Sequence, residues 1–188
     1  MTLRLATPDD AAAVAAIYAP AVTDSATSFE AVSPDAAEMA ARIAATLPRY
    51  PWLVAESGGR VAGYAYAGLH RARAAYAWSA ETSVYLAADA QGRGLGRTLM
   101  TALLEILRMQ GFAVAYAGAT LPNDASVGLH RALGFGDVGV FPRAGFKHGR
   151  WHDTWWGARD LGSGRAPDLT LAVSDLGADA LAACLAGA

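Results

Sequence analysis

The glycine-rich segment 91–96, with the sequence QGRGLG, is the part of the chain best suited to chemistry. It follows a strand-like segment and precedes an apolar pattern of helical spacing. Glycines let backbone N–H groups converge without Cβ clashes, and a helix N-terminus adds partial positive charge. Arg93 and Arg97 add full positive charges. The segment therefore predicts a site for a pyrophosphate.

Two common phosphate-binding motifs do not fit this turn. A P-loop has Lys followed by Ser or Thr after its last glycine, whereas Arg97 follows Gly96 here. A dinucleotide fingerprint needs a glycine three residues after Gly94, and that position is again Arg97. What remains is the pattern Gln-x-x-Gly-x-Gly between a strand and a helix.

A second motif covers residues 123–135, with the sequence NDASVGLHRALGF. It begins at Asn123, has His130 seven residues later and ends in Leu-Gly-Phe. A histidine can give or take a proton near neutral pH. Glu81, just before a strand-like segment, is a second titratable candidate. Each residue also has an interpretation without a catalytic role: His130 as a histidine on the helix surface, and Glu81 as a member of an ion pair at the strand edge.

The two motifs in this order resemble those of the GCN5-related N-acetyltransferase (GNAT) family. The resemblance implies an α+β fold with a mixed, mostly antiparallel sheet flanked by helices. It implies that the glycine turn holds the pyrophosphate of acetyl-CoA and that Asn123 meets the pantetheine arm. Most of the family has Tyr where this chain has His130.

Several further strings resemble phosphinothricin and methionine sulfone or sulfoximine N-acetyltransferases. They include RYPWLVAE at 49–56, ARAAYAW at 72–78, ETSVY at 81–85 and KHGRWHD at 147–153. The resemblance covers about residues 2–161. It implies direct transfer of an acetyl group to the α-amine of a small amino-acid-like substrate.

The resemblance assigns the site residues in three groups. Glu81 is the general base, and His130 is either the acid that protonates the thiolate or a second base. Acetyl-CoA is expected to be bound by Val84, Tyr85, Leu86, Gln91, Gly92, Arg93, Gly94, Leu95, Gly96, Arg97, Thr98, Asn123 and Ser126. A backbone N–H within 84–86 would polarise the thioester carbonyl. The substrate is expected to contact Arg73, Tyr76, Phe29 and Lys147.

Each substrate residue also has a plainer interpretation. Arg73 resembles a carboxylate-binding arginine, whose guanidinium forms a bidentate clamp, but a solvated loop arginine would look the same. Tyr76 fits a pocket wall or the core, and Lys147 fits either an anionic group or solvent. His148, His152 and Asp153 are close in sequence, but a strand or turn would not align them as metal ligands, so no metal is expected.

The elements that position these residues follow from periodicity and turn residues. The expected order is β-α-α-β-β-β-α-β-α-β-β. Strands are expected at 2–7, 52–56, 61–69, 82–87, 112–120, 135–141 and 151–160, and helices after 7, 35, 96 and 123. Residues 1–161 would form the domain and 162–167 a linker. The tail beyond it would be a weak helix or loose, with no assigned role.

Composition limits the remaining possibilities. The 188 residues are 54% hydrophobic and 17% charged, with a net charge of −2. The charge balance argues against nucleic-acid partners and polybasic membrane binding, and no apolar run reaches the length of a transmembrane helix. A single cysteine, Cys184, suggests a reducing cytoplasm.

The family resemblance implies a homodimer. Acetylation of another amine or antibiotic, or a non-catalytic acyl-CoA-binding module, remain alternatives; a protein substrate is disfavoured.

Overall fold

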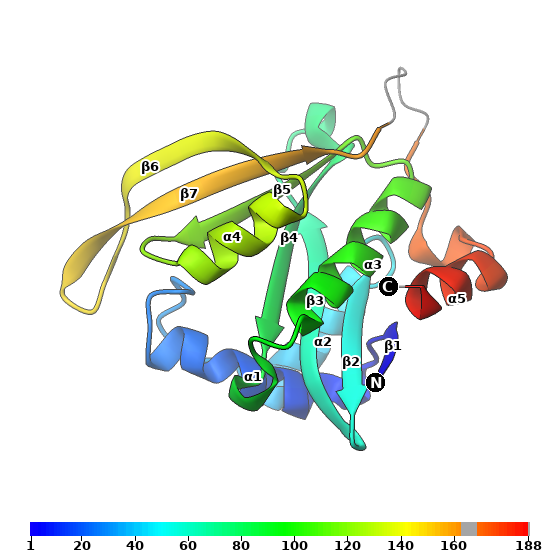
Figure 1. Ribbon diagram of the computed structural model, residues 1–188, viewed down its shortest axis with the longest axis horizontal. Coiled ribbons are helices and arrows are strands. Elements are labelled where there is room, and N and C mark those ends of the chain that lie inside the picture. Colours follow the sequence, from blue (N-terminus) through cyan, green and yellow to red (C-terminus); the bar gives the residue numbers. More distant parts are fainter. Residues whose placement is uncertain (163–168, 188) are drawn as a thin grey trace.

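The computed structural model describes residues 1–162 and 169–187 and contains one twisted sheet between helices (Figure 1). The strands are β1 (Thr2–Leu5), β2 (Trp52–Ser57), β3 (Arg60–Leu69), β4 (Ser79–Leu86), β5 (Val114–Thr120), β6 (Gly136–Lys147) and β7 (Arg150–Asp160). The α-helices are α1 (Ala11–Thr23), α2 (Ala36–Thr46), α3 (Leu95–Met109), α4 (Asp124–Ala132) and α5 (Ala178–Ala186). Single 3₁₀ turns are η1 (Pro8–Asp10), η2 (Ala74–Tyr76), η3 (Ala88–Ala90) and η4 (Val173–Asp175).

The sheet has the strand order β1-β2-β3-β4-β5-β7-β6. All neighbouring strands are antiparallel except β4 and β5, which are parallel. This confirms the predicted mixed sheet and the predicted order of its main elements.

Strand boundaries differ from the prediction by one or two residues in most places, and by more at two. β4 begins at Ser79, three residues early, because Ser79 pairs with β5 and Ala80 with both β3 and β5. β6 continues to Lys147 through a segment expected to be a turn, and its register shifts between Phe141 and Gly145. Pairing with the long β7 thus overrides the local turn signal. The two strands form an arm that projects from the body (Figure 1).

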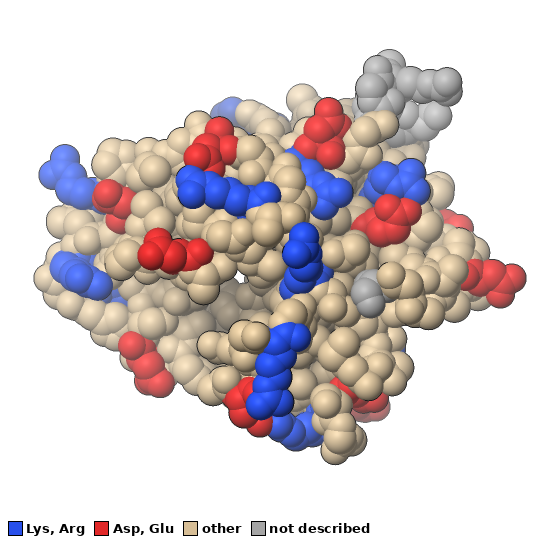
Figure 2. Space-filling view, in the orientation of Figure 1, with Lys and Arg blue, Asp and Glu red and all other residues tan. Residues whose placement is uncertain are grey.

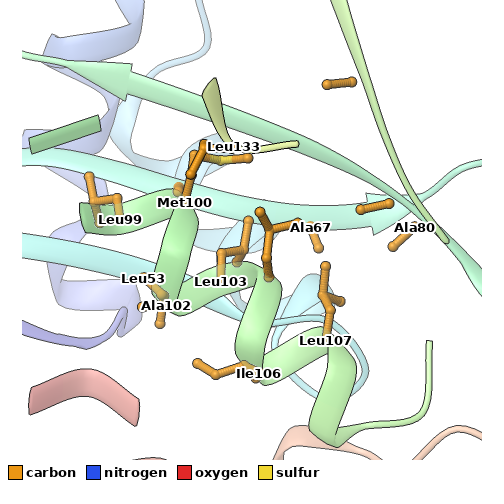
Figure 3. Close-up of a cluster of buried hydrophobic side chains, with 14 of the residues drawn as sticks. Leu53, Ala67, Ala80, Leu99, Met100, Ala102, Leu103, Ile106, Leu107 and Leu133 are labelled. Carbon is orange, nitrogen blue, oxygen red and sulfur yellow. The ribbon is translucent and has the colours of Figure 1, made fainter. Parts of the chain in front are cut away.

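The packing of α3 onto the sheet forms the larger of two cores. Its leucine and isoleucine side chains recur at helical spacing and are fully buried against alanines of the strands (Figure 3). Ala67 and Ala80 are among these partners, and their small side chains let the helix approach the sheet closely. On the opposite face, α1 and α2 cover an aromatic layer that contains Trp52 and Tyr64. The sheet therefore separates two packed layers.

The C-terminal segment packs against this body. Helix α5 contacts α3 and β1. The Gln110 side chain donates hydrogen bonds to the carbonyl oxygens of Leu171 and Arg49, both at 2.8 Å. Arg49 in turn donates to the Ala77 carbonyl and the Thr170 hydroxyl. The tail, expected to be either a weak helix or loose, contains α5, whereas the predicted linker beyond residue 162 lies outside the described residues. None of the described helices could span a membrane.

Candidate active site

A cleft of about 1070 Å³ runs between α1, the end of β4 and the start of α4. Of the thirteen residues expected to bind acetyl-CoA, those that line it are Val84, Tyr85, Leu86, Gln91, Gly92, Gly94, Leu95, Gly96, Arg97, Asn123 and Ser126. Arg93 and Thr98 lie in the same turn and helix but do not line the cleft. Two motifs that begin 32 residues apart in the sequence, at Gln91 and Asn123, therefore meet at one concave surface.

The glycine turn has the conformation that its residues suggest. Gly92 and Gly94 have φ angles of 71° and 82°, a region that other residues adopt at a cost. Gly96 lies under α4, since a Cβ there would be 3.3 Å from the Leu129 side chain. Helix α3 begins at Leu95, which lines the cleft. The first backbone N–H groups of a helix have no carbonyl partner within the helix, and here they lie at the cleft. The turn can therefore present N–H groups to an anion.

Basic side chains reinforce this end of the cleft. Figure 2 shows Lys and Arg side chains in a column over the region where α3 begins, beside a hollow in the surface. Arg97 and Arg60 both line the cleft. Arg60 also forms a close ion pair with Asp89. Arg60 was not among the predicted residues, because nothing in its own β-hairpin points toward the distant glycine turn.

The strands β4 and β5 separate beside the cleft. They pair only from Ser79 to Glu81, and Glu81 lies opposite Tyr116 at the last paired position. Beyond it, the Thr82 hydroxyl donates to the Tyr116 carbonyl at 3.0 Å. The edge of β4 that faces β5 then has no strand partner through residues 83–86. Figure 1 shows the two strands diverging. We call this point the fork.

Glu81 lies at the fork with a half-buried side chain. Burial raises the pKa of its carboxyl, an effect that the positive charge of Arg71 partly offsets. A carboxylate with a raised pKa is a stronger base than an exposed one. Its Oε2 lies 3.8 Å from Nδ1 of His70. Glu81, Ser83 and Tyr85 share one face of β4, which leads from the fork into the cleft.

His130 is buried rather than on the helix surface, with 3% of its area exposed. Its ring contacts those of Phe135 and Trp155. Nδ1 donates to the Ser126 carbonyl oxygen at 2.8 Å, so in the neutral ring Nε2 carries the lone pair. Nε2 is buried and has no partner in the described part of the chain. Burial lowers the pKa of His130, and the side chain does not line the cleft.

The predicted substrate residues lie outside the cleft. Arg73 is exposed at the start of η2. Tyr76 is 36% exposed with its ring edge toward His70, and Phe29 is 43% exposed. None of the four lines the cleft.

The Lys147 side chain forms hydrogen bonds within the protein. Its Nζ donates to the carbonyl oxygens of Val22 and Ser28, at 2.5 and 2.7 Å. It thereby fastens the segment that carries Phe29 to β6. The nearby His152 is bonded to the Lys147 carbonyl oxygen. Within residues 1–162 and 169–187, no group of three or more His, Cys, Asp or Glu could hold a metal ion.

An aromatic cluster beside Glu81 was missed by sequence reasoning. The His70 ring stacks on Tyr116 with ring centroids 4.1 Å apart, and Trp156 lies edge-on to it at 6.3 Å. These residues come from the end of β3, from β5 and from β7. Only the sheet order brings them together, so no local pattern could have found them.

Comparisons with known proteins agree with this geometry. The model of the Acetyltransferase (GNAT) domain matches residues 3–156. The chain is 46% identical to a phosphinothricin N-acetyltransferase of Alcaligenes faecalis, over 90% of this chain and 86% of that protein. It is 38% identical to an L-methionine sulfoximine/L-methionine sulfone acetyltransferase of Salmonella typhimurium, over 89% and 99% of the two chains.

A solved structure is similar over nearly the whole fold. It is a GNAT superfamily phosphinothricin acetyltransferase from Sinorhizobium meliloti in complex with acetyl-CoA, with a TM-score of 0.85 and 39% identity. The match covers 90% of this chain and 92% of that one. The chain with this glycine turn, fork and strand order thus matches the domain model over most of its length. We conclude that the chain belongs to the GNAT acetyltransferase family.

Proposed function

We propose that the chain transfers an acetyl group from acetyl-CoA to the α-amine of a small amino-acid-like substrate, namely phosphinothricin, methionine sulfone or methionine sulfoximine. The observation that carries the proposal is the position of Glu81, a carboxylate with a raised pKa at the fork beside the cleft. The relatives named for these substrates support the choice of amine.

The residues of the cleft suit acetyl-CoA. The amides of the glycine turn and the start of α3, with Arg97, would hold the pyrophosphate. The unpartnered edge of β4 would pair with the amides of the pantetheine arm, alongside Asn123. Asn123 uses its side-chain oxygen to cap α4, accepting from the Ser126 amide at 3.1 Å, so its NH₂ group remains for a ligand. When bound, acetyl-CoA supplies the acetyl group as a thioester.

The chain's own groups would then assist direct transfer. Glu81 takes a proton from the substrate ammonium, directly or through water. A backbone N–H within 84–86 polarises the carbonyl of the acetyl group. His130 is the second titratable group. Its neutral ring carries a lone pair on Nε2, the atom that would take up or return a proton, and burial disfavours the imidazolium form.

The amine substrate would lie on the α1–α2 face of β4, against Glu81. Arg73 on the neighbouring loop would bind its carboxylate or phosphinate group, and Tyr76 and Phe29 would form apolar walls. Lys147 would act by holding the segment of Phe29, although its third proton could still reach an anionic group.

Replacing Arg73 with Ala is expected to raise the KM for the amine substrate about tenfold or more, because a charge-assisted clamp to the substrate anion is lost. The KM for acetyl-CoA should not change, since Arg73 does not line the cleft. Steady-state kinetics with each substrate varied in turn would measure both values. Arg108→Ala, at an exposed arginine of α3, is the control. An unchanged amine KM would remove Arg73 from the site.

Thiol release from acetyl-CoA against a panel of free amino acids tests the function. Phosphinothricin, methionine sulfone and methionine sulfoximine belong in the panel. Turnover with one of these three would support the proposal. Turnover with a different amine would place the chain in another branch of the family. Acetyl-CoA binding without turnover on any amine would favour a non-catalytic module.

The chain would act as a homodimer formed through the β6–β7 arm. Its exposed apolar side chains are Val138, Val140, Phe141, Phe146 and Trp151, each 47–61% exposed. Phe146 and Trp151 form an edge-to-face pair near the tip of the arm. A patch of this kind marks an interaction surface. Of the other tryptophans of β7, Trp155 is core, with 4% exposed.

The variant Phe146→Ser/Trp151→Ser is expected to convert dimers to monomers, because it removes the two most exposed aromatic side chains of the arm. Sedimentation velocity would show twice the chain mass for the parent and one chain mass for the variant. Val32→Ser, at an exposed valine elsewhere, is the matched control. A monomeric parent would contradict the dimer.

The lone thiol of Cys184 accords with a cytoplasmic location.

A further inference from the structure

His70 is held rigidly beside Glu81. Its ring stacks on Tyr116 with the planes inclined by 10°, and the ring edges of Tyr76 and Trp156 lie 6.0 and 6.3 Å away. Only 10% of its side chain is exposed. Aromatic contacts on three sides fix the plane of the imidazole. In this plane, Nδ1 of His70 lies 3.8 Å from Oε2 of Glu81.

The Nδ1 atom of His70 is buried and has no hydrogen-bond partner among the residues that the structure describes. Buried polar groups of folded proteins are nearly always paired, and an exception calls for a functional reason. A shift of about 1 Å in the Glu81 carboxylate would bring Oε2 within hydrogen-bond distance. The fold thus keeps a free nitrogen next to the proposed base.

The proposed reaction releases one proton. The ammonium loses a proton, the amine nitrogen forms a bond to the acetyl carbon, and the C–S bond breaks with its electron pair left on sulfur. The nitrogen then loses a second proton, and the sulfur takes one up to give the free thiol. One proton therefore remains at Glu81 after each turnover. It must reach solvent before the carboxylate can act again.

We propose that His70 relays this proton: Nδ1 accepts it from Glu81, and Nε2 releases a proton to solvent. In the step, the O–H bond of the protonated carboxyl breaks, an N–H bond forms at Nδ1, and the Nε2–H bond breaks at the other side of the ring. His70 thus acts through Glu81 and does not touch the substrate. The inference rests on the proposed acetyl transfer.

The groups around His70 favour this role. The titratable or charged groups that face it are Glu81 from β4, Tyr116 from β5, Tyr76 from η2 and the adjacent Arg71. Burial, and less strongly Arg71, lower the pKa of His70, so the ring is neutral and can accept a proton. Burial raises the pKa of Glu81. The pKa of His70 and the pKa of Glu81 are thus moved toward each other, which reduces the free energy needed to transfer the proton.

His70→Phe tests the relay, because phenylalanine keeps the stacking on Tyr116 and removes both nitrogens. We expect kcat to fall about tenfold, with the KM for acetyl-CoA unchanged. As the pH drops, kcat/KM of the parent should fall with the protonation of two groups, Glu81 and His70. In the variant, it should fall with the protonation of Glu81 alone. A uniform decrease with the same pH profile would mean that His70 is only structural and would overturn the proposal.

A double-mutant cycle with Glu81→Gln adds a second criterion. A relay that works through Glu81 has no effect once the carboxylate is gone, so His70→Phe should cause no further loss in that background. An equal additional loss in the double variant would contradict the relay.

An NMR titration of the His70 ring separates this proposal from the acetyl-transfer proposal, since it needs no substrate. The Glu81 carboxylate favours the imidazolium, so Glu81→Gln should lower the pKa of His70 by about one unit. An unchanged titration would overturn the coupling. Failure to acetylate any amine, with the shift present, would instead count against the proposed substrate class.

Discussion

Replacing Glu81 with Gln is expected to lower kcat by about 10²- to 10⁴-fold, the usual contribution of a general base. Glutamine keeps the size and polarity of the side chain but cannot take a proton from the ammonium. Binding of acetyl-CoA should not change, because Glu81 does not line the cleft. Single-turnover kinetics and calorimetric titration with acetyl-CoA would measure the two effects separately. Glu105→Gln, at a half-buried carboxylate of α3 away from the fork, is the matched control.

The pH dependence gives the same experiment a second outcome. The base must be deprotonated, so kcat/KM of the parent should fall as the pH drops through a pKa above the ordinary value of Glu. Burial raises the folded-state pKa, so the contribution of Glu81 to stability is present below its unfolded pKa and is lost as the pH rises through its folded pKa. At neutral pH, Glu81→Gln should therefore not lower Tm. Full activity of the variant would refute the base assignment.

Sequence reasoning succeeds where one local segment carries the whole signal. The turn at 91–96 could be recognised because Gly92 and Gly94, which have positive φ angles, come directly before a helix, and both features depend on neighbouring residues. Asn123 could be placed because an Asn before a helix commonly caps it, and its oxygen does so here. Glu81 was indicated by the family resemblance, and its fork geometry became visible only in the sheet.

The remainder of the site depends on contacts between distant segments. The ring nitrogen beside Glu81 belongs to His70, which lies 11 residues earlier but comes near it only because β4 runs back along β3. Lys147 appears suited to a substrate anion by charge, yet it bonds carbonyl groups more than 100 residues away. The length of β6 likewise follows from pairing with β7 rather than from its own turn residues. Spacing along the chain contains no information on such contacts.

Gly94→Ala is expected to raise the KM for acetyl-CoA about 5- to 30-fold. Gly94 has a φ of 82°, and no atom lies within 4 Å of the position of an added Cβ. The substitution therefore meets no steric obstacle, and its cost comes from the backbone, at about 1–2 kcal/mol for a residue other than glycine. The free turn can relax away from this conformation, whereas a bound pyrophosphate requires it. Binding then has to restore the strained turn, and that cost appears as lost affinity.

Gly111→Ala is the matched control for this prediction. Gly111 follows the opposite end of α3, has a φ of 88° and is equally open around its Cβ position. The same conformational cost there should lower the free energy of unfolding by about 1–2 kcal/mol without changing the KM for acetyl-CoA. Urea denaturation and steady-state kinetics on both variants separate the two effects. If Gly94→Ala lost stability but kept its affinity, the turn would not be the pyrophosphate site, and the N-terminus of α3 would serve only to connect β4 to the helix.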